Sequence, residues 1–293
     1  MRQTWGYKGI WDPGFLLVLT KLTTRMVRLL GAAYLGRRVR ARSPYTCCIV
    51  ILSYRRPHNI DLLVRLALRC DAVGEVIVHN NARHLQLGDW ISVSDSRLRI
   101  VEYPKDVGHG IRWKLAAQSS FDWFVSIDDD VFLEAEQIAA LFDHLIENPA
   151  VPHGISAEVY HLHERPQPPL GPFEEEPYGP YHDYPFMVRV IRKDMEVDHL
   201  TMTYAFTREH LQRAQQHLKV LGLADMSELY NGDDLLLSFA GNGRPQIHDL
   251  GSFLQCTSMI IPGVAFCCST ANFRPERLRV HRLLSGQRQD RAQ

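Results

Sequence analysis

The chain has 293 residues, 45% of them hydrophobic, and its 33 basic and 33 acidic residues give a formal net charge of zero. This length can form one large domain or two small ones. The balanced charge gives no whole-chain argument for nucleic-acid binding, and no stretch reaches the roughly 18–20 apolar residues of a membrane span. The six cysteines, four of them in two adjacent pairs, match neither a disulfide framework nor a zinc motif, which favours a reducing compartment.

The N-terminal region is basic, with nine Lys and Arg against one acidic residue in the first 45 positions. Apolar residues recur at helical spacing over 15–33, while Lys21, Arg25 and Arg28 fall on another face. This pattern predicts a basic amphipathic helix and a following linker. Two interpretations stay open: residues 15–42 lie on an anionic membrane surface, or the helix packs on the rest of the protein.

Strand and helix patterns alternate from residue 45 to residue 150. Apolar stretches rich in β-formers predict strands at 46–53, 74–79, 98–102 and 122–127, and helical spacing predicts helices at 58–70, 107–119 and 134–147. Such alternation predicts an α/β, Rossmann-like half built on parallel strands with right-handed crossovers.

The pattern becomes irregular after residue 150. We expect strands at 151–160, 187–191, 199–206 and 246–251, and helices at 208–221, 230–239 and 274–284. Seven prolines in residues 165–185 predict a long irregular loop, either a cover over the site or partly disordered. The expected organisation is an N-terminal segment at 1–44, one domain at 45–285 with halves at 45–150 and 151–285, and a tail at 286–293.

Polar side chains follow three of the predicted strands. They are Arg55 and Arg56 after the first strand, Asn80 and Asn81 after the second, and Asp128, Asp129 and Asp130 after the fourth. Because open α/β sheets bind ligands beyond the carboxyl ends of their strands, this convergence indicates a nucleotide site. Three adjacent carboxylates repel one another unless a cation lies there, and oxygen ligands suit Mg²⁺ or Mn²⁺. The alternative is a solvated acidic turn before a helix.

A second acidic pair, Asp233 and Asp234, opens the helix expected at 230–239. One acid in the first turn is explained by the helix dipole, but two exceed what capping requires. The closing helix is rich in arginine, including Arg277, and this suits either a bound diphosphate or a solvated basic face.

Together these motifs resemble the C-terminal catalytic domain of the exostosin family, glycosyltransferase family 64, over about residues 45–284. The similarity rests on V-I-V-H-N-N at 76–81, R-W-K at 112–114, I-D-D-D-V-F-L at 127–133, the strand-helix stretch at 199–214, N-G-D-D-L-L-L-S-F at 231–239 and the Arg-rich end. It implies a GT-A fold, in which a Rossmann-like half with a mixed central sheet is fused to an acceptor-binding half. It also implies a metal-dependent enzyme that uses Mn²⁺ (or Mg²⁺) and moves an N-acetylhexosamine or hexose from a UDP-sugar to a glycan or glycolipid acceptor. The implied transfer retains the anomeric configuration of the sugar.

The resemblance implies a role for each matched residue. Metal ligands would be Asp130 and Asp128, and Asp128 would also face the donor sugar, with Asp129 between the two. Further donor-binding residues would be Arg55, Asn80, Asn81, His109, Arg112 and Lys114. The catalytic residues would be Asp234 near the reacting carbon, Asp233 beside it, and Arg277 at the diphosphate.

The chain also departs from that family. Gly232 and Val280 stand where the animal members carry two cysteines that pair, which fits a site outside an oxidising lumen. His109 stands near a position that is typically Asn, and a Trp-His element expected before the closing arginines is replaced by Asn-Phe at 272–273. We therefore expect a cytoplasmic enzyme, peripheral on the inner face of a membrane.

Two alternatives belong to other classes of mechanism or protein. The enzyme could invert the anomeric carbon, with Asp233 or Asp234 as the base that deprotonates the acceptor. The chain could instead be a catalytically silent scaffold that only binds nucleotides. A third alternative, a structural zinc site at His161, His163 and the cysteines, is weaker, because His-x-His without a spaced ligand pair is usually a polar loop.

Overall fold

The structure is a computed structural model that describes residues 13–82, 85–102, 107–158, 187–191, 193–256 and 273–290. Helix α1 (Pro13–Leu35) precedes an alternating half: β1 (Cys47–Ser53), α2 (Pro57–Leu68), β2 (Val73–Asn80), η1 (Leu87–Asp89), β3 (Leu98–Glu102), α3 (Ile111–Gln118), β4 (Trp123–Asp128), β5 (Val131–Phe132) and α4 (Ala135–Glu147). These bounds lie within a few residues of the predicted ones, since apolar periodicity is strong here.

The second half is built from shorter elements. They are β6 (His153–Gly154), β7 (Ala157–Glu158), β8 (Met187–Ile191), β9 (Met195–Glu196), β10 (His199–Leu200), β11 (Thr203–Thr207), α6 (Arg208–Leu221), η2 (Met226–Glu228), α7 (Asp233–Ser238), β12 (Gln246–Ile247), β13 (Gly251–Gln255) and α9 (Phe273–Asp290). The loop at 161–185, with His161 and His163, lies outside the described residues. Helix α9 continues past the end expected at residue 284, into the predicted tail.

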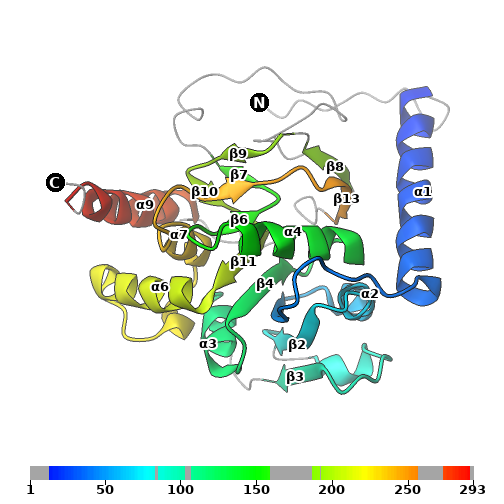
Figure 1. Ribbon diagram of the computed structural model, residues 1–293, viewed down its shortest axis with the longest axis horizontal. Helices are drawn as coiled ribbons and strands as arrows, with labels where there is room; N and C mark the ends of the chain where they lie inside the picture. The colour runs from blue at the N-terminus through cyan, green and yellow to red at the C-terminus, as the bar shows by residue number, and fades with distance from the viewer. Residues whose placement is uncertain are drawn as a thin grey trace.

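The central sheet has the order β3-β2-β1-β4-β11-β6-β12-β9 (Figure 1). Strands β3, β2, β1 and β4 run parallel, and β11 pairs antiparallel with β4, so the predicted α/β fold with a mixed sheet is confirmed. Every residue of β1 is buried, as expected for a central strand covered on both faces. The register pairs Ser53 with Asn80 and Leu52 with Asp128, which puts the ends of three strands at one edge.

Several strand predictions in the second half were wrong. The strand expected at 151–160 is two short strands, β6 and β7, that belong to different sheets. The one expected at 199–206 breaks at Met202, whose φ of 65° takes the backbone out of the extended region. The strand at 246–251 ends at Ile247, and β13 was missed, although it is the middle strand of the β5-β13-β8 sheet, because its five residues carry little periodicity.

Helix α1 packs on the protein, against α2, β8 and β13. Leu29 and Ala33 are buried, and Arg25, predicted to lie on a different face from the apolar residues, is only 7% exposed. Its Nη1 lies 2.6 Å from Oε1 of Glu134, and Nε of Arg28 lies 2.9 Å from the same oxygen. The prediction for Arg25 was wrong because the start of α4 presents a carboxylate to this face. None of the described helices combines the length and the hydropathy that crossing a bilayer requires.

Candidate active site

The acidic triplet lies where β4 ends at the edge of the sheet. Asp128 is the last residue of β4, a two-residue turn follows, and β5 begins at Val131. The backbone N–H of Asp128 donates to the carbonyl of Met202, and that of Cys256 donates to the carbonyl of Asp130. The buried strand β4 and these two backbone hydrogen bonds, to Met202 and from Cys256, therefore fix the backbone of the triplet.

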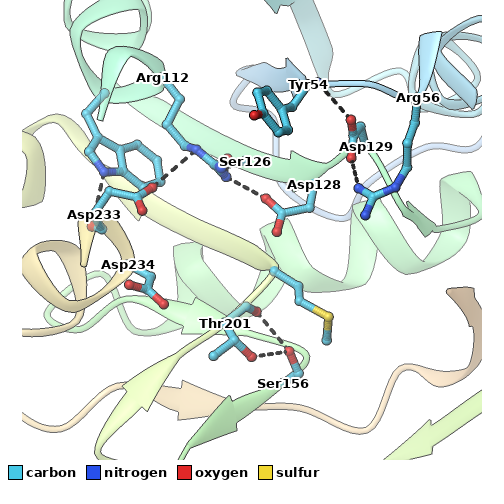
Figure 2. Close-up of polar contacts among 12 residues, drawn as sticks. Tyr54, Arg56, Arg112, Ser126, Asp128, Asp129, Ser156, Thr201, Asp233 and Asp234 are labelled. Carbon is cyan, nitrogen blue, oxygen red and sulfur yellow. Dashed lines mark hydrogen bonds and ion pairs between the residues drawn. The ribbon is translucent and has the colours of Figure 1, made fainter. Parts of the chain in front are cut away.

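Asp129 points inward from the triplet. It is 4% exposed, its Oδ1 pairs with Arg56, and its Oδ2 accepts from the backbone N–H of Tyr54 at 2.9 Å (Figure 2). Burial alone would lower the pKa of Arg56, but Asp129 and Asp130 outweigh it and raise that pKa. This contact ties the end of β1 to the triplet, and a nucleotide-binding role for Asp129 stays a prediction.

The two arginines that follow β1 differ in position. Arg56 is buried against the triplet, whereas Arg55, the one assigned to the nucleotide, is exposed with its guanidinium 4.8 Å from the ring centre of Tyr54. Tyr54 and Arg55 lie in a bend after β1, so strand alternation does not separate the two arginines. Which arginine of the pair faces inward depends on a register that the sequence alone does not determine.

Arg112 lies between two of the predicted acidic residues (Figure 2). Its Nη1 is 2.6 Å from Oδ1 of Asp128, and its Nε is 3.3 Å from Oδ2 of Asp233. Burial raises the pKa of Asp128, and Arg112 opposes that rise. Helix α3 thus supplies one buried cation to carboxylates that lie more than a hundred residues apart in the chain.

Asp234 lies next to this group and has its own cation. Its Oδ1 is 2.7 Å from Nη1 of Arg277, and both side chains are 9% exposed. The indole N–H of Trp113 donates to the carbonyl of Asp233 at 3.1 Å, which attaches the start of α7 to α3. The structure therefore brings together five of the predicted site residues from four elements: Asp128, Arg112, Asp233, Asp234 and Arg277.

Tyr204 on β11 joins this group but was not predicted. Its pKa is raised well above the ordinary value, first by burial and then by Asp234, Asp128 and Asp233. The residue is 3% exposed and its ring packs edge-on against Trp113. A single Tyr in a strand carries no sequence signal for such a place.

Both asparagines at the end of β2 hold neighbouring loops. Asn80 Nδ2 donates to Glu102 Oε2 and to the carbonyl of Leu85, each at 2.6 Å. Asn81 exchanges two hydrogen bonds with the backbone of Val107, at 2.9 and 3.0 Å. Their direct contact with a nucleotide stays a prediction; what the structure shows is that they shape the edge of the sheet.

The two remaining candidates are His109, just before α3, and Lys114, within α3, and they have different neighbours. His109 lies beside Tyr54, with 6.3 Å between ring centres, and burial, then Arg112, lowers its pKa to about 3. Lys114 is rotated by about 200° from Arg112 on the helix. Its Nζ is 2.8 Å from Oδ2 of Asp225. The structure therefore does not bring Lys114 to the carboxylate group, and its donor-binding role stays a prediction.

The triplet fits a Mg²⁺ or Mn²⁺ ion that is shared with a diphosphate. Its three carboxylates do not form a compact set of ligand atoms, because Asp129 turns inward. Asp128 and Asp130 remain at the edge, with side chains 29% and 15% exposed. These ions are commonly held by one or two carboxylates, substrate phosphates and water, so two carboxylates suffice.

We predict that Asp233 destabilises the metal-free protein at neutral pH. Burial raises its pKa from 3.8 to about 6, against the opposing effect of Arg112. Below about pH 4 the carboxyl is protonated in both states, and as pH rises through 6 the folded state must ionise it at a cost. Asp233→Asn should therefore raise the free energy of unfolding at pH 8 by roughly 2–3 kcal/mol.

This prediction is checked by urea unfolding in EDTA between pH 4 and pH 8. The difference in the free energy of unfolding between the variant and the wild type should shrink towards pH 4. Asp122→Asn is the matched control, because that side chain is 74% exposed. A difference that does not change with pH would contradict the raised pKa.

Comparisons with known proteins identify the fold. No protein-family model matches the sequence, and no curated protein matches it. S. aureus TarS 1–349 in complex with UDP-GlcNAc aligns at 14% identity over 82% of this chain and 65% of that chain, with a TM-score of 0.50. The same protein with UDP aligns at 12% over 82% and 65%, with a TM-score of 0.49.

GalNAc-T7 with UDP, GalNAc and Mn²⁺ also aligns, at 10% identity over 80% of this chain and 48% of that chain, with a TM-score of 0.49. The chain spans about half to two thirds of the length of these structures. At such identities the likeness concerns the fold alone. The chain has the GT-A fold that its sequence motifs predict.

Proposed function

We propose that this chain is a metal-dependent glycosyltransferase, a hexosyltransferase that uses a UDP-sugar donor and retains the anomeric configuration. Its acceptor would be a glycan or a glycolipid. The observation that carries the proposal is the buried group at the sheet edge, where Arg112 joins Asp128 to Asp233 beside the Asp234–Arg277 pair. The fold shared with the UDP-GlcNAc complex of TarS supports a UDP-sugar donor.

Each group at the edge has a distinct chemical task. Asp128 and Asp130 would hold the metal, which when bound neutralises charge on the leaving diphosphate. Arg112 orients Asp128 and opposes the burial that raises the pKa of this carboxyl, and Arg277 orients Asp234 through its ion pair. A carboxylate fixed beside the anomeric carbon stabilises the positive charge that develops there during transfer. Asp234 is the residue to which we assign that task.

The positions of Gly232 and Val280 support a specific likeness to the exostosin family. A Cβ built on Gly232 would lie 3.5 Å from Cβ of Val280. Disulfides have Cβ–Cβ distances of about 3.5–4.5 Å. Gly232 and Val280 stand at the two positions where animal members of the exostosin family carry disulfide-bonded cysteines. These positions are thus neighbours in this chain, although they are 48 residues apart in the sequence.

We predict that Gly232→Cys combined with Val280→Cys forms a disulfide under mild oxidation. The bridge should raise the stability of the folded chain by about 2–3 kcal/mol, less the strain of a non-glycine residue at φ 85°. Thermal unfolding with and without reductant, together with thiol titration, measures this. The single variants are the controls, and a double variant that keeps both thiols free would contradict the alignment.

The experiment that tests the proposal measures UDP released from a panel of UDP-sugars in Mn²⁺, followed by NMR assignment of the product anomer. Retention would match the proposal. An inverted product would favour the second candidate mechanism, in which Asp233 is the base; the raised pKa of Asp233, about 6, suits that task. Tight nucleotide binding without hydrolysis or transfer would instead favour a silent scaffold.

We further propose a cytoplasmic enzyme that touches the inner face of a membrane through residues 15–42. Leu19, Val27, Leu30 and Leu35 are exposed on α1, although the helix packs on the protein by its other side. Val27→Asp combined with Leu35→Asp should abolish co-sedimentation with anionic vesicles and leave the melting temperature unchanged, because these residues are 64% and 87% exposed. Unchanged sedimentation would rule out α1 as the anchor.

A further inference from the structure

A cluster of histidines lies at the far end of α4 from the acidic triplet. His144 is in the last turns of α4, His153 is the first residue of β6, and His248 follows β12; Asp194 precedes β9. Nine residues separate the start of α4 from His144, or about 14 Å along the helix axis. The cluster is therefore separate from the proposed active site.

The hydrogen bonds of His153 determine the proton positions. Its Nε2 lies 2.7 Å from the carbonyl of Asn148, which only accepts, so Nε2 carries a proton. In a neutral imidazole that carries its proton on Nε2, the other ring nitrogen, Nδ1, is an acceptor. Nε2 of His248 lies 2.7 Å from that Nδ1 and must donate to it.

This leaves Nδ1 of His248 as a bare lone pair inside the protein. His248 is 6% exposed, and its Nδ1 makes no hydrogen bond. Oδ2 of Asp194, which is also an acceptor, lies 3.6 Å away. Two facing acceptors are best satisfied by a cation between them.

We propose that His144, His248 and Asp194 bind a divalent transition-metal ion, for which Zn²⁺ is the probe. One ligand atom of each residue lies within 4.8 Å of the others. Two imidazoles and one carboxylate suit zinc and its late first-row neighbours better than Mg²⁺ or Mn²⁺, and water completes a tetrahedral site. His153 is the positioning residue, since its hydrogen bond fixes the tautomer of His248.

Binding requires a small contraction of the cluster. Zinc–ligand bonds of about 2.1 Å place tetrahedral ligands about 3.4 Å apart. The rings of His144 and His248 are stacked at 3.8 Å with an angle of 6°, so one ring must turn for both lone pairs to meet at the ion. His144 and Asp194 have side chains that are 30% and 60% exposed, and these have room to move, while buried His248 stays in place.

The ion would act as a structural clamp. It would join the end of α4 to the outer strands β12 and β9, segments that lie about fifty and a hundred residues apart in the chain. Binding only in the folded state raises the melting temperature as the ion concentration rises. This inference does not depend on the proposed transferase activity.

The test is equilibrium dialysis of the full chain against Zn²⁺ in excess Mg²⁺, which occupies the aspartate site but competes poorly for imidazole. We expect one Zn²⁺ per chain and a higher melting temperature. Asp194→Asn and His144→Gln should each raise the Kd at least about 100-fold, because loss of an outer-shell partner alone costs 10–100-fold. His248→Gln should do the same, but the first two carry the test, because Asp194 is exposed and His144 is only half-buried, so both variants should fold.

Three matched variants separate this site from others. Asp249→Asn changes the acidic residue that directly follows His248, and His58→Gln removes an exposed histidine elsewhere. Asp130→Asn removes a ligand of the proposed active-site metal. All three variants should bind zinc as the wild type does. Absence of bound zinc, or binding that Asp194→Asn and His144→Gln leave unchanged, would overturn the proposal. Loss of zinc in Asp130→Asn would also overturn it.

Discussion

Asp234→Asn and Asp130→Asn are each expected to lower kcat for sugar transfer by about 10²–10³-fold. Asn preserves the shape of each side chain and removes its charge. Asp234→Asn removes the carboxylate that Arg277 orients. Asp130→Asn removes a ligand of the metal. The measurement is UDP release in saturating UDP-sugar and Mn²⁺, with folding followed by circular dichroism.

The two variants differ in their cost to stability, which keeps the result interpretable. Asp234 is paired with buried Arg277, so its loss lowers stability as well as activity. Asp130 lies 3.6 Å from Arg56, whose closer partner is Asp129, so its loss should lower the melting temperature less than the loss of Asp234 does. Exposed Asp122→Asn is the control. Full activity in both site variants would contradict the proposal that this edge of the sheet is a transferase active site.

Arg112→Met is expected to lower the free energy of unfolding by about 3–5 kcal/mol at pH 8, since it leaves the carboxylates of Asp128 and Asp233 without their shared cation. Both carboxyls already have raised pKa values because they are buried. Protonation relieves their repulsion, so the loss should shrink as pH falls from 8 to 5. Chemical denaturation at both pH values measures it.

The control for this variant is Arg65→Met. Arg65 pairs with Asp61 at i, i+4 on α2, with side chains 21% and 14% exposed, and such a pair contributes at most about 1 kcal/mol. A loss at Arg112 no larger than that of the control, or equal at pH 5 and pH 8, would mean that Arg112 does not hold two buried carboxylates.

The parallel half could be predicted because each element has its own local signal. The apolar run of β1 and the helical spacing of α4 depend on neighbours within one turn or strand. The strand order also placed Asp128 and Asn80 at one edge before any contact was known. Short β6, β7 and β9 carry too few residues for a period, so they escaped prediction.

The site was predicted by residue type more than by contact. That Asp128, Arg112 and Asp233 meet depends on how α3 and α7 dock, which no local pattern specifies. For the same reason, no local pattern specified that Lys114 pairs with Asp225. The cluster of His144, Asp194 and His248 was missed entirely, since its members have no motif spacing in the sequence.

The most direct test of the central claim is a thermal-shift panel of UDP, GDP, CMP and dTDP, each with and without Mn²⁺. Ligand at about 100 times its Kd should stabilise the chain by about 2.7 kcal/mol. The account predicts a shift with UDP that requires Mn²⁺ and is lost in Asp130→Asn. A panel with no shift for any nucleotide, or a UDP shift that is indifferent to both Mn²⁺ and Asp130, would contradict it.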